Sequence, residues 1–368
     1  MADSRCVMII AGEPSGDIHG AKLVRAMKRR TPSLFFCGIG GDSLRDAGVK
    51  IVVDASELSV VGITEVFSKI PGIFKGMSAA KKLMRILRPD LLILIDFPDF
   101  NLHLAATAKR LAIPVLYYIS PQIWAWRSGR VKKIARRVDH MAVILPFEAD
   151  FYRKHRVPVT FVGHPLLDTK PVSPAPVSCP VRIGFLPGSR EGEIARHLPV
   201  MLDAARILSR HYKEISFTIS LAPSVDKKFV EDMVSQSPVP ISLVSGAEEI
   251  FKQSTLVVAA SGTVSLEAAI AGVPMVVIYK VSPVSYRIGR ALIQVEHISL
   301  VNLIAGKEII PELIQDEASP ENIAEAVSEI LRNPGGLEKL RKELLGIKHM
   351  LGMPGASERV ADIAAGML

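Results

Sequence analysis

Residues 256–267 read LVVAASGTVSLE, and residues 272–277 read GVPMVV. The first apolar run predicts a buried strand, the small residues after it predict a turn, and a short helix is expected to begin near Thr263. A second buried strand is expected from Met275. Buried strands joined by helices are typical of a parallel sheet covered on both faces, so this stretch indicates an α/β fold.

The turn in this stretch also has the features of a binding site. A small-residue turn at Ser261 and Gly262 exposes backbone N–H groups at the positive end of a helix, which attracts an anion. Glu267 follows Thr263 by about one helical turn, where a carboxylate could hold a pair of sugar hydroxyls. The stretch therefore predicts a nucleotide-sugar site. The alternative is an ordinary strand-to-helix turn with Glu267 in solvent.

Strand and helix patterns alternate along all 368 residues. Residues 168–180 interrupt them with four prolines and predict an extended connector. We therefore expect two doubly wound α/β domains, residues 1–167 and 168–345, followed by a helical tail over 346–368. Ligands of such domains bind at the carboxyl ends of the strands, so we expect the site in the cleft between the two domains. Apolar strands are expected at residues 6–10, 34–37, 51–53, 91–95, 115–119, 141–145, 159–162, 182–186, 215–221, 241–244 and 256–260.

Composition excludes several protein classes. The sequence is 49% hydrophobic and 6% aromatic, which is typical of a folded globular chain, and its apolar runs are strand-length. The N-terminal residues contain an acid and run directly into a strand, so a signal peptide is not expected. Three scattered cysteines form neither a disulfide framework nor a metal cluster, and we expect a cytoplasmic protein.

The net charge of +8 predicts an acidic partner. The basic segment 127–137 could bind nucleic acid, anionic lipid or phosphate, or be a solvated helix face. Neither zinc-ligand spacing nor an aromatic RNA-binding pattern accompanies this segment, so nucleic acid is not the expected partner.

Residues 11–20 read AGEPSGDIHG and follow the first predicted strand. The glycine spacing does not fit a dinucleotide fingerprint, and polar side chains occupy positions where a pyrophosphate needs bare backbone. The turn instead predicts contacts to a polyhydroxylated or phosphorylated substrate. Helix capping by Ser15 and Asp17 is the alternative. The candidate polar groups are Glu13, Ser15, Asp17 and His19.

Residues 95–101 read IDFPDFN at the end of an apolar strand. This is where α/β enzymes place catalytic groups, and burial would raise the pKa of an aspartate there toward neutrality. A transferase needs such a base because sugar hydroxyls are weak nucleophiles. We expect Asp96 to be the base, while Asp99 is also expected to cap a helix that begins near Asn101.

Three further segments contain candidate ligand contacts. Residues 121–127 read PQIWAWR, and the paired indoles of Trp124 and Trp126 beside Arg127 suit sugar stacking or a membrane-facing edge, with packing of the rings in the core as the alternative. Residues 186–193 read LPGSREGE, and Gly188, Ser189 and Arg190 predict a second anion site at a helix start. Asn302 lies in an apolar loop, where it is either a phosphate contact or a buried turn amide.

The segment 60–77 is apolar, contains lysines and is interrupted by Pro71 and Gly72. A surface of this kind suits contact with a membrane or an acyl chain. The alternatives are a pair of core helices and a dimer contact. The apolar candidates are Val66, Phe67, Ile70, Ile73 and Phe74.

Taken together, these segments resemble the lipid A disaccharide synthase family of bacterial glycosyltransferases. The matching motifs occur in the family's order over about residues 7–310. They are residues 11–17, 95–101, 120–127, 145–148, 161–165, 186–190, 261–263 and 302–306.

The resemblance implies a GT-B fold: two Rossmann-like domains, acceptor side first and nucleotide-sugar side second, with the final helix packing back on the first domain. It implies transfer of 2,3-diacylglucosamine from UDP to 2,3-diacylglucosamine 1-phosphate, which yields a β-1,6-linked disaccharide 1-phosphate and UDP for lipopolysaccharide synthesis in Gram-negative bacteria. The reaction inverts the anomeric carbon and is expected to use no metal and no cofactor. Both substrates carry acyl chains, so we expect peripheral attachment to the cytoplasmic leaflet of the inner membrane.

Residue roles follow from the same resemblance. Asp96 is expected to be the base, aided by Glu13 or Asp99, and Glu267 to hold the ribose. The diphosphate is assigned to Gly188, Ser189, Arg190, Gly262, Thr263 and Asn302, and the acceptor sugar to Ser15, Asp17, His19, Trp124 and Arg127. Whether two copies form a homodimer is left open. The competing functions are a UDP-N-acetylglucosamine epimerase, another lipid-linked glycosyltransferase, and a peripheral membrane or nucleic-acid protein.

Overall fold

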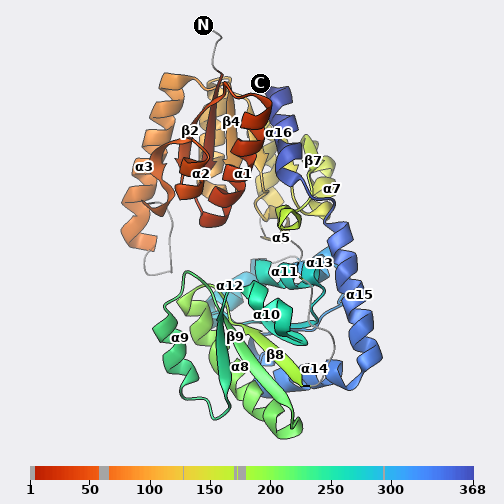
Figure 1. Cartoon of the computed structure of the whole chain (residues 1–368). Coiled ribbons are helices and arrows are strands. Elements are labelled where there is room, and N and C mark those ends of the chain that lie inside the picture. Colours follow the sequence, from red (N-terminus) through yellow and green to blue (C-terminus); the bar gives the residue numbers. More distant parts are fainter. Residues whose placement is uncertain (1–4, 58–65, 127, 170–171, 173–179, 293–294) are drawn as a thin grey trace. The chain divides into compact units, whose positions relative to one another are not determined.

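Two parallel sheets organise the chain, one in each of its two units (Figure 1). This computed structural model describes residues 5–57, 66–126, 128–169, 172, 180–292 and 295–368. The first unit comprises Met1–Asp168 together with Leu351–Leu368, and the second comprises Thr169–Met350. The chain therefore leaves the first unit at Asp168 and returns to it at Leu351, close to the expected boundaries at residues 167 and 346.

The sheet of the first unit has the strand order β3-β2-β1-β4-β5-β6-β7. Its central strands are buried on both faces: along β1, Met8 and Ile10 enter one apolar cluster, whereas Val7 and Ile9 enter the other. Helices cover both clusters, as expected for uninterrupted apolar strands. The strands are β1 (Cys6–Ala11), β2 (Phe35–Gly40), β3 (Lys50–Asp54), β4 (Leu91–Ile95), β5 (Val115–Tyr118), β6 (His140–Val143) and β7 (Val159–Phe161). The helices are α1 (Pro14–Arg30), α2 (Asp42–Asp46), α3 (Val66–Leu87), α4 (Pro98–Arg110), α5 (Ile123–Trp126), α6 (Val131–Arg137), α7 (Pro146–Lys154) and α16 (Ala356–Met367).

The second sheet has the order β10-β9-β8-β11-β12-β13 and is also parallel throughout. Its strands are β8 (Val181–Leu186), β9 (Ile215–Leu221), β10 (Ile241–Ser245), β11 (Leu256–Ala260), β12 (Met275–Tyr279) and β13 (Glu312–Ile314). Its helices are α8 (Glu191–His211), α9 (Lys227–Val234), α10 (Ala247–Gln253), α11 (Thr263–Ala271), α12 (Pro283–Leu292), α13 (Leu300–Ala305), α14 (Pro320–Arg332) and α15 (Pro334–Met350).

In each sheet the direction of winding reverses once. The chain builds outward from β1 to β3, then starts again beside β1 with β4; in the second unit it restarts beside β8 with β11. The loops after the two strands at such a reversal diverge to opposite faces of the sheet and leave room for a ligand. The pairing of Ala11 with Ile95, and of Leu186 with Ala259, places the following residues side by side.

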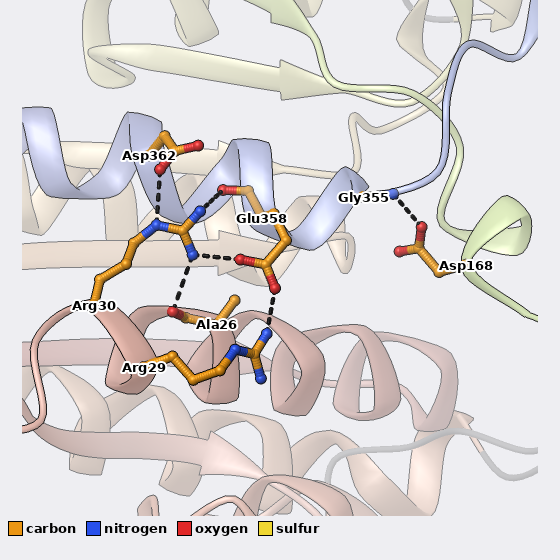
Figure 2. A network of polar contacts seen from close by, with 7 residues as sticks. All are labelled: Ala26, Arg29, Arg30, Asp168, Gly355, Glu358 and Asp362. Carbon is orange, nitrogen blue, oxygen red and sulfur yellow. Dashed lines mark hydrogen bonds and ion pairs between the residues drawn. The ribbon is translucent and has the colours of Figure 1, made fainter.

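The C-terminal helix α16 lies along α1 in the first unit (Figure 2). Arg30 donates from Nε to Asp362 Oδ1 over 2.7 Å and from NH2 to the Glu358 carbonyl over 3.1 Å. Arg29 and Arg30 both form ion pairs with Glu358. At the start of the helix, Gly355 donates its N–H to Asp168. The contacts between α1 and α16 join residues more than 300 positions apart in the sequence.

Two helices differ from the sequence-based expectation. Helix α1 begins at Pro14, whereas the sequence pattern predicts a helix over residues 23–30 only. Helix α3 continues through Pro71 and Gly72 instead of breaking there. The α3 positions 73, 77, 80 and 84 follow the i, i+4, i+7, i+11 spacing and pack on the core, which stabilises the helix beyond the proline. Among the residues described, we find no helix that is both long and apolar enough to span a bilayer.

Candidate active site

Two acidic side chains mark the reversal point of the first sheet. Glu13 follows β1, and Asp96 follows β4 directly. Because β1 and β4 are parallel neighbours, both loops leave the same edge of the sheet. The charge of Glu13 also acts on the Asp96 carboxyl, which agrees with this placement.

Asp96 is held in an unusual backbone conformation. Its φ is 44° and that of Phe97 is 49°, so two consecutive non-glycine residues are left-handed. Tyr117 donates its hydroxyl to the Asp96 carbonyl over 2.7 Å, and Asn101 Nδ2 donates to the same oxygen over 2.6 Å. The Phe97 ring lies where a Cβ on Gly12 would come within 2.4 Å, so only glycine fits at residue 12. The surrounding side chains thereby fix the turn that carries the carboxylate.

The environment of Asp96 changes its acidity. Burial raises the pKa of the Asp96 carboxyl to about 6, and the negative charge of Glu13 acts in the same direction. A carboxylate with a pKa near neutrality is mostly ionised at pH 7 yet accepts a proton more readily than an ordinary aspartate. Asp96 is thus the acid group of this edge best suited to take up a proton.

Asp99 differs from Asp96 in position and surroundings. Helix α4 begins at Pro98 with Phe97 as its N-cap, so the expectation that Asp99 caps a helix starting near Asn101 is wrong. Asp99 lies inside the first turn, its side chain is exposed, and it forms an ion pair with Arg130. A carboxylate that is exposed to solvent and paired with a guanidinium is poorly suited to act as a base.

The polar residues of the first turn have different surroundings. The Asp17 carboxylate is buried and accepts N–H groups from Gly41, Ser43 and Leu44 at 2.6, 2.9 and 3.3 Å. Its oxygens therefore hold the start of α2, which corrects the expectation that Asp17 binds sugar or caps its own helix. Ser15 is exposed in the first turn of α1.

His19 lies one turn further along α1 and is partly buried. Burial lowers the pKa of its imidazole to about 4, with a further lowering by Lys22. The ring is therefore neutral at pH 7, and its buried Nδ1 has no hydrogen-bond partner among the described residues. A neutral imidazole of this kind can accept a hydrogen bond from a sugar hydroxyl or donate one to it.

Trp124 lies in α5, beyond the end of β5. Its Nε1 donates to Glu148 Oε1 over 3.1 Å, and its ring meets the Phe147 ring edge-on with centroids 4.7 Å apart. Glu148 is buried, and burial raises the pKa of its carboxyl to about 7. Trp124 is therefore anchored on one side and only partly buried. Arg127 lies outside the described residues.

The second sheet has a pocket of about 480 Å³ at its reversal point, within the size range of small-ligand sites. It lies where β8, β9 and β11 end and where α8, α10 and α11 begin. Its lining comprises Leu186, Gly188, Ser189, Arg190, Glu193, Ser220, Ala222, Pro223, Gly246, Ala247, Ala260, Ser261, Gly262, Thr263, Val264 and Glu267. Six of the seven residues assigned to UDP from the sequence thus line one pocket.

Each half of this pocket presents groups that suit a nucleoside diphosphate. Gly262 and Thr263 start α11, and a Cβ at Gly262 would meet nothing within 4 Å, so the helix start is open. Glu267 is partly buried one turn later, and burial raises the pKa of its carboxyl. Across the pocket, the Arg190 side chain is largely exposed and ion-pairs with Glu193.

Asn302 is the exception, because its amide is already fully used. Nδ2 donates to the Ile310 carbonyl and to Glu312 Oε1, while Oδ1 accepts the N–H groups of Ile309 and Ile310. The side chain is completely buried. The expectation that Asn302 binds phosphate is therefore wrong. Its amide is buried and structural, as in the alternative, but the residue lies in helix α13 and not in the expected loop.

Sequence reasoning gave no role to Glu193 or His197. Glu193 contacts the backbone of the 188–190 loop, and its only sequence signal is its position one helical turn after Ser189. His197 Nδ1 lies 2.9 Å from the Pro187 carbonyl oxygen, and His197 Nε2 accepts the Lys280 N–H over 3.0 Å. It ties the end of β8 to the end of β12, which the sequence spacing of 83 residues does not reveal.

The apolar segment near residue 70 is only partly described. The side chains of Val66, Phe67 and Ile70 lie outside the described part of the structure. Ile73 packs on the core cluster, whereas Phe74 is 71% exposed next to the exposed Lys75.

Among the residues described, no group of three or more His, Cys, Asp or Glu is arranged to hold a metal ion. The expectation of a metal-free reaction stays a prediction.

Comparison with known proteins identifies the family of the chain. The chain matches the lipid-A-disaccharide synthetase family over residues 7–354. It is 48% identical to the lipid-A-disaccharide synthase of Syntrophus aciditrophicus, covering 98% of this chain and 97% of the relative. It is 47% identical to that of Geobacter metallireducens, covering 100% and 98%.

A solved structure supports the fold. The crystal structure of the glycotransferase of kitacinnamycin superposes with a TM-score of 0.66 at 14% sequence identity and covers 100% of both chains. The two Rossmann-like units with a C-terminal helix are those of the GT-B fold, as expected from the sequence. Together with the match over residues 7–354, this places the chain in the lipid-A-disaccharide synthetase family.

Proposed function

We propose that the chain is a lipid-A-disaccharide synthase that transfers 2,3-diacylglucosamine from UDP to the 6-hydroxyl of 2,3-diacylglucosamine 1-phosphate. The products are the β-1,6-linked disaccharide 1-phosphate and UDP. The family match over residues 7–354 is the observation that carries this function. The residue roles below are our own assignment from the geometry of each unit.

We assign the proton transfer to Asp96. Inversion requires a single displacement: the acceptor oxygen attacks the anomeric carbon, the bond from that carbon to UDP breaks, and the hydroxyl proton passes to the base. Asp96 suits this role because its pKa is about 6 and its turn is fixed by Tyr117 and Asn101. Glu13 tunes Asp96 through its charge, and we give Asp99 no part in the chemistry.

We assign UDP to the pocket of the second unit. Gly188, Ser189 and Arg190 on one side, and Gly262 and Thr263 on the other, would hold the diphosphate and stabilise the departing charge. Glu267 would accept hydrogen bonds from the ribose hydroxyls, and its raised pKa agrees with a partly buried carboxylate that gains partners on binding.

For the acceptor sugar we retain Ser15, His19 and Trp124, which follow the ends of β1 and β5 in the first unit. Arg127 remains a prediction from the sequence. We further propose that α3 contacts the membrane through Phe74, with the exposed Lys75, Lys82 and Arg85 meeting anionic lipid.

The decisive experiment is an incubation of the purified chain with UDP-2,3-diacylglucosamine and 2,3-diacylglucosamine 1-phosphate. Formation of the disaccharide phosphate with one UDP released per product supports the proposal. UDP release with an epimerised sugar would indicate a UDP-sugar epimerase instead. If a different acceptor is glycosylated, the chain is another lipid-linked glycosyltransferase, and no reaction with either substrate would contradict an enzymatic function of this class.

A further inference from the structure

The Glu193 carboxylate occupies donors that the proposed diphosphate site needs. Oε2 accepts the Ser189 backbone N–H over 3.1 Å, and Oε1 accepts the Arg190 guanidinium NH1 over 3.1 Å. Both partners are residues that the proposed function gives to the diphosphate. Glu193 also lines the same pocket, so its contacts lie within the site.

The loop is shaped to let the carboxylate reach these donors. Gly188 has a φ of 127°, and a Cβ there would come within 2.7 Å of Glu193 Oε2 and 2.8 Å of Glu193 Cβ. Glycine therefore gives the side chain room to lie over the turn. Glu193 is the third residue of α8, where the positive end of the helix also favours a negative charge.

A carboxylate and a phosphate cannot share these donors without repulsion. Both are anions that seek backbone N–H groups and a guanidinium at a helix start, and like charges at contact distance oppose each other. The Glu193 side chain is one-third exposed, so it can rotate away into solvent. The carboxylate thus resembles the diphosphate in charge and in hydrogen-bonding partners.

We propose that Glu193 is an internal competitor for the diphosphate: it occupies Ser189 N–H and Arg190 in the empty site, is displaced by the UDP-sugar, and returns as UDP leaves. This inference rests on the proposed UDP site. It makes Glu193 a residue that sets the affinity for the nucleotide and shields Arg190 while the site is empty. The alternative is that Glu193 only holds the loop in shape.

Calorimetric titration of the full chain with UDP separates the two roles. Glu193→Gln keeps an oxygen that can accept the Ser189 N–H but removes the charge, and we expect it to bind UDP roughly 3- to 30-fold more tightly. The gain should shrink between about 0.05 and 0.5 M NaCl because salt screens the competing charge. Uridine, which lacks the diphosphate, should bind both proteins equally.

Glu191→Gln is the matched control, because it removes the same charge from the same helical turn at an exposed residue that does not line the pocket. It should change UDP affinity less than about twofold. Unchanged or weaker UDP binding by Glu193→Gln would overturn the competitor role. Equal gains in Glu191→Gln and Glu193→Gln would overturn it as well, since the effect would then be one of net charge.

A third variant, Arg190→Ala, distinguishes an error in the role of Glu193 from an error in the location of the UDP site. Arg190→Ala should weaken UDP binding. If it does and Glu193→Gln brings no gain, only the competitor role is wrong. If Arg190→Ala leaves UDP affinity unchanged, UDP does not bind at the 188–190 loop. The assigned UDP site and the competitor role of Glu193 are then both wrong.

Discussion

The reversal points of the two sheets have the same architecture but opposite chemistry. In the first unit the loops after β1 and β4 present the carboxylates Glu13 and Asp96, one of them on a strained turn with a raised pKa. In the second unit the loops after β8 and β11 present backbone N–H groups, two glycines and Arg190. One edge is suited to taking up a proton and the other to binding an anion.

This difference shows how one fold supports two tasks. The sheet order decides where a site forms, because both reversals leave space at the carboxyl ends of the strands. The residue types in the loops decide what the site does. Burial next to Glu13 keeps the pKa of a base near neutrality, whereas the open start of α11 and Arg190 across the pocket favour phosphate. The predictions below test this division of roles.

The largest effect is expected at the proton-accepting edge. Asp96→Asn should lower kcat about 100- to 10,000-fold, because a positioned base is lost, while UDP affinity stays within about twofold. Turnover and calorimetric titration with UDP measure the two quantities. Asp99→Asn is the matched control and should keep a kcat close to that of the wild type, because Asp99 is exposed and paired with Arg130. Retained turnover after Asp96→Asn would remove Asp96 from the role of base.

The next largest effect is expected at the anion-binding edge. Arg190→Ala should weaken UDP binding roughly 10- to 100-fold, because charge-assisted hydrogen bonds to the diphosphate are lost. The pH at which turnover falls on the acid side should not move, since Arg190 belongs to the other edge. Arg196→Ala controls for charge, because Arg196 is on the same helix but outside the pocket. A shifted acid limb would contradict the separation of the two tasks.

A smaller effect is expected on the surface of α3. Phe74→Ser should lower binding to anionic vesicles about 3- to 10-fold, because an exposed aromatic side chain no longer enters the bilayer interface. Sedimentation with vesicles measures the binding, and circular dichroism checks that the fold is retained. Val52→Ser is a control at another exposed apolar residue of the same unit. Equal vesicle binding by the wild type and the Phe74→Ser variant would favour a role in dimer contacts or none.

The smallest effect is a shift in pH dependence. The pKa of Asp96 is about 6, and Glu13 raises it through like charge, so Glu13→Gln should lower that pKa. Because the base must be ionised, the acid limb of kcat/KM, near pH 6 in the wild type, should move to lower pH. At a given pH below about 6 the variant should then keep a larger fraction of its maximal kcat/KM than the wild type, with the slope of the limb unchanged. Asp46→Asn, at an exposed residue of the same unit, should leave the limb unchanged, and a limb moving upward would show that Glu13 does not act by charge.

Most of the fold could be predicted from local sequence. The run 91–95 is apolar at every position and forms β4 with those bounds, and 256–260 forms β11 in the same way. Proline and glycine were less informative: Pro71 did not end α3, because the apolar stripe on that helix packs on the core. The short edge strand β13 has no long apolar run and was not expected.

The candidate site was predictable where residues act through the backbone or lie directly after a strand. Gly188, Gly262 and Asp96 follow strand ends, so the sequence places them at the edge of a sheet. It could not show that Asp17 and Asn302 use their oxygens to bind backbone groups 24 to 27 and 7 to 8 residues away. Those partners depend on how distant loops fold together.

By itself, the sequence determined that this chain is α/β, that it contains two doubly wound domains, and which polar residues follow the strand ends. Hydrophobic periodicity and turn chemistry are local properties of the sequence. Only the tertiary structure decided which of those polar groups remain available to a substrate. Hydrogen-bond partners, burial and neighbouring charge come from residues far away in the chain. The sequence predicted from its place at a strand end that burial raises the pKa of Asp96, but it did not show that the charge of Glu13 adds to this effect. Nor did it show that Glu193 contacts Ser189 and Arg190 in the pocket that Ser261 and Gly262 also line.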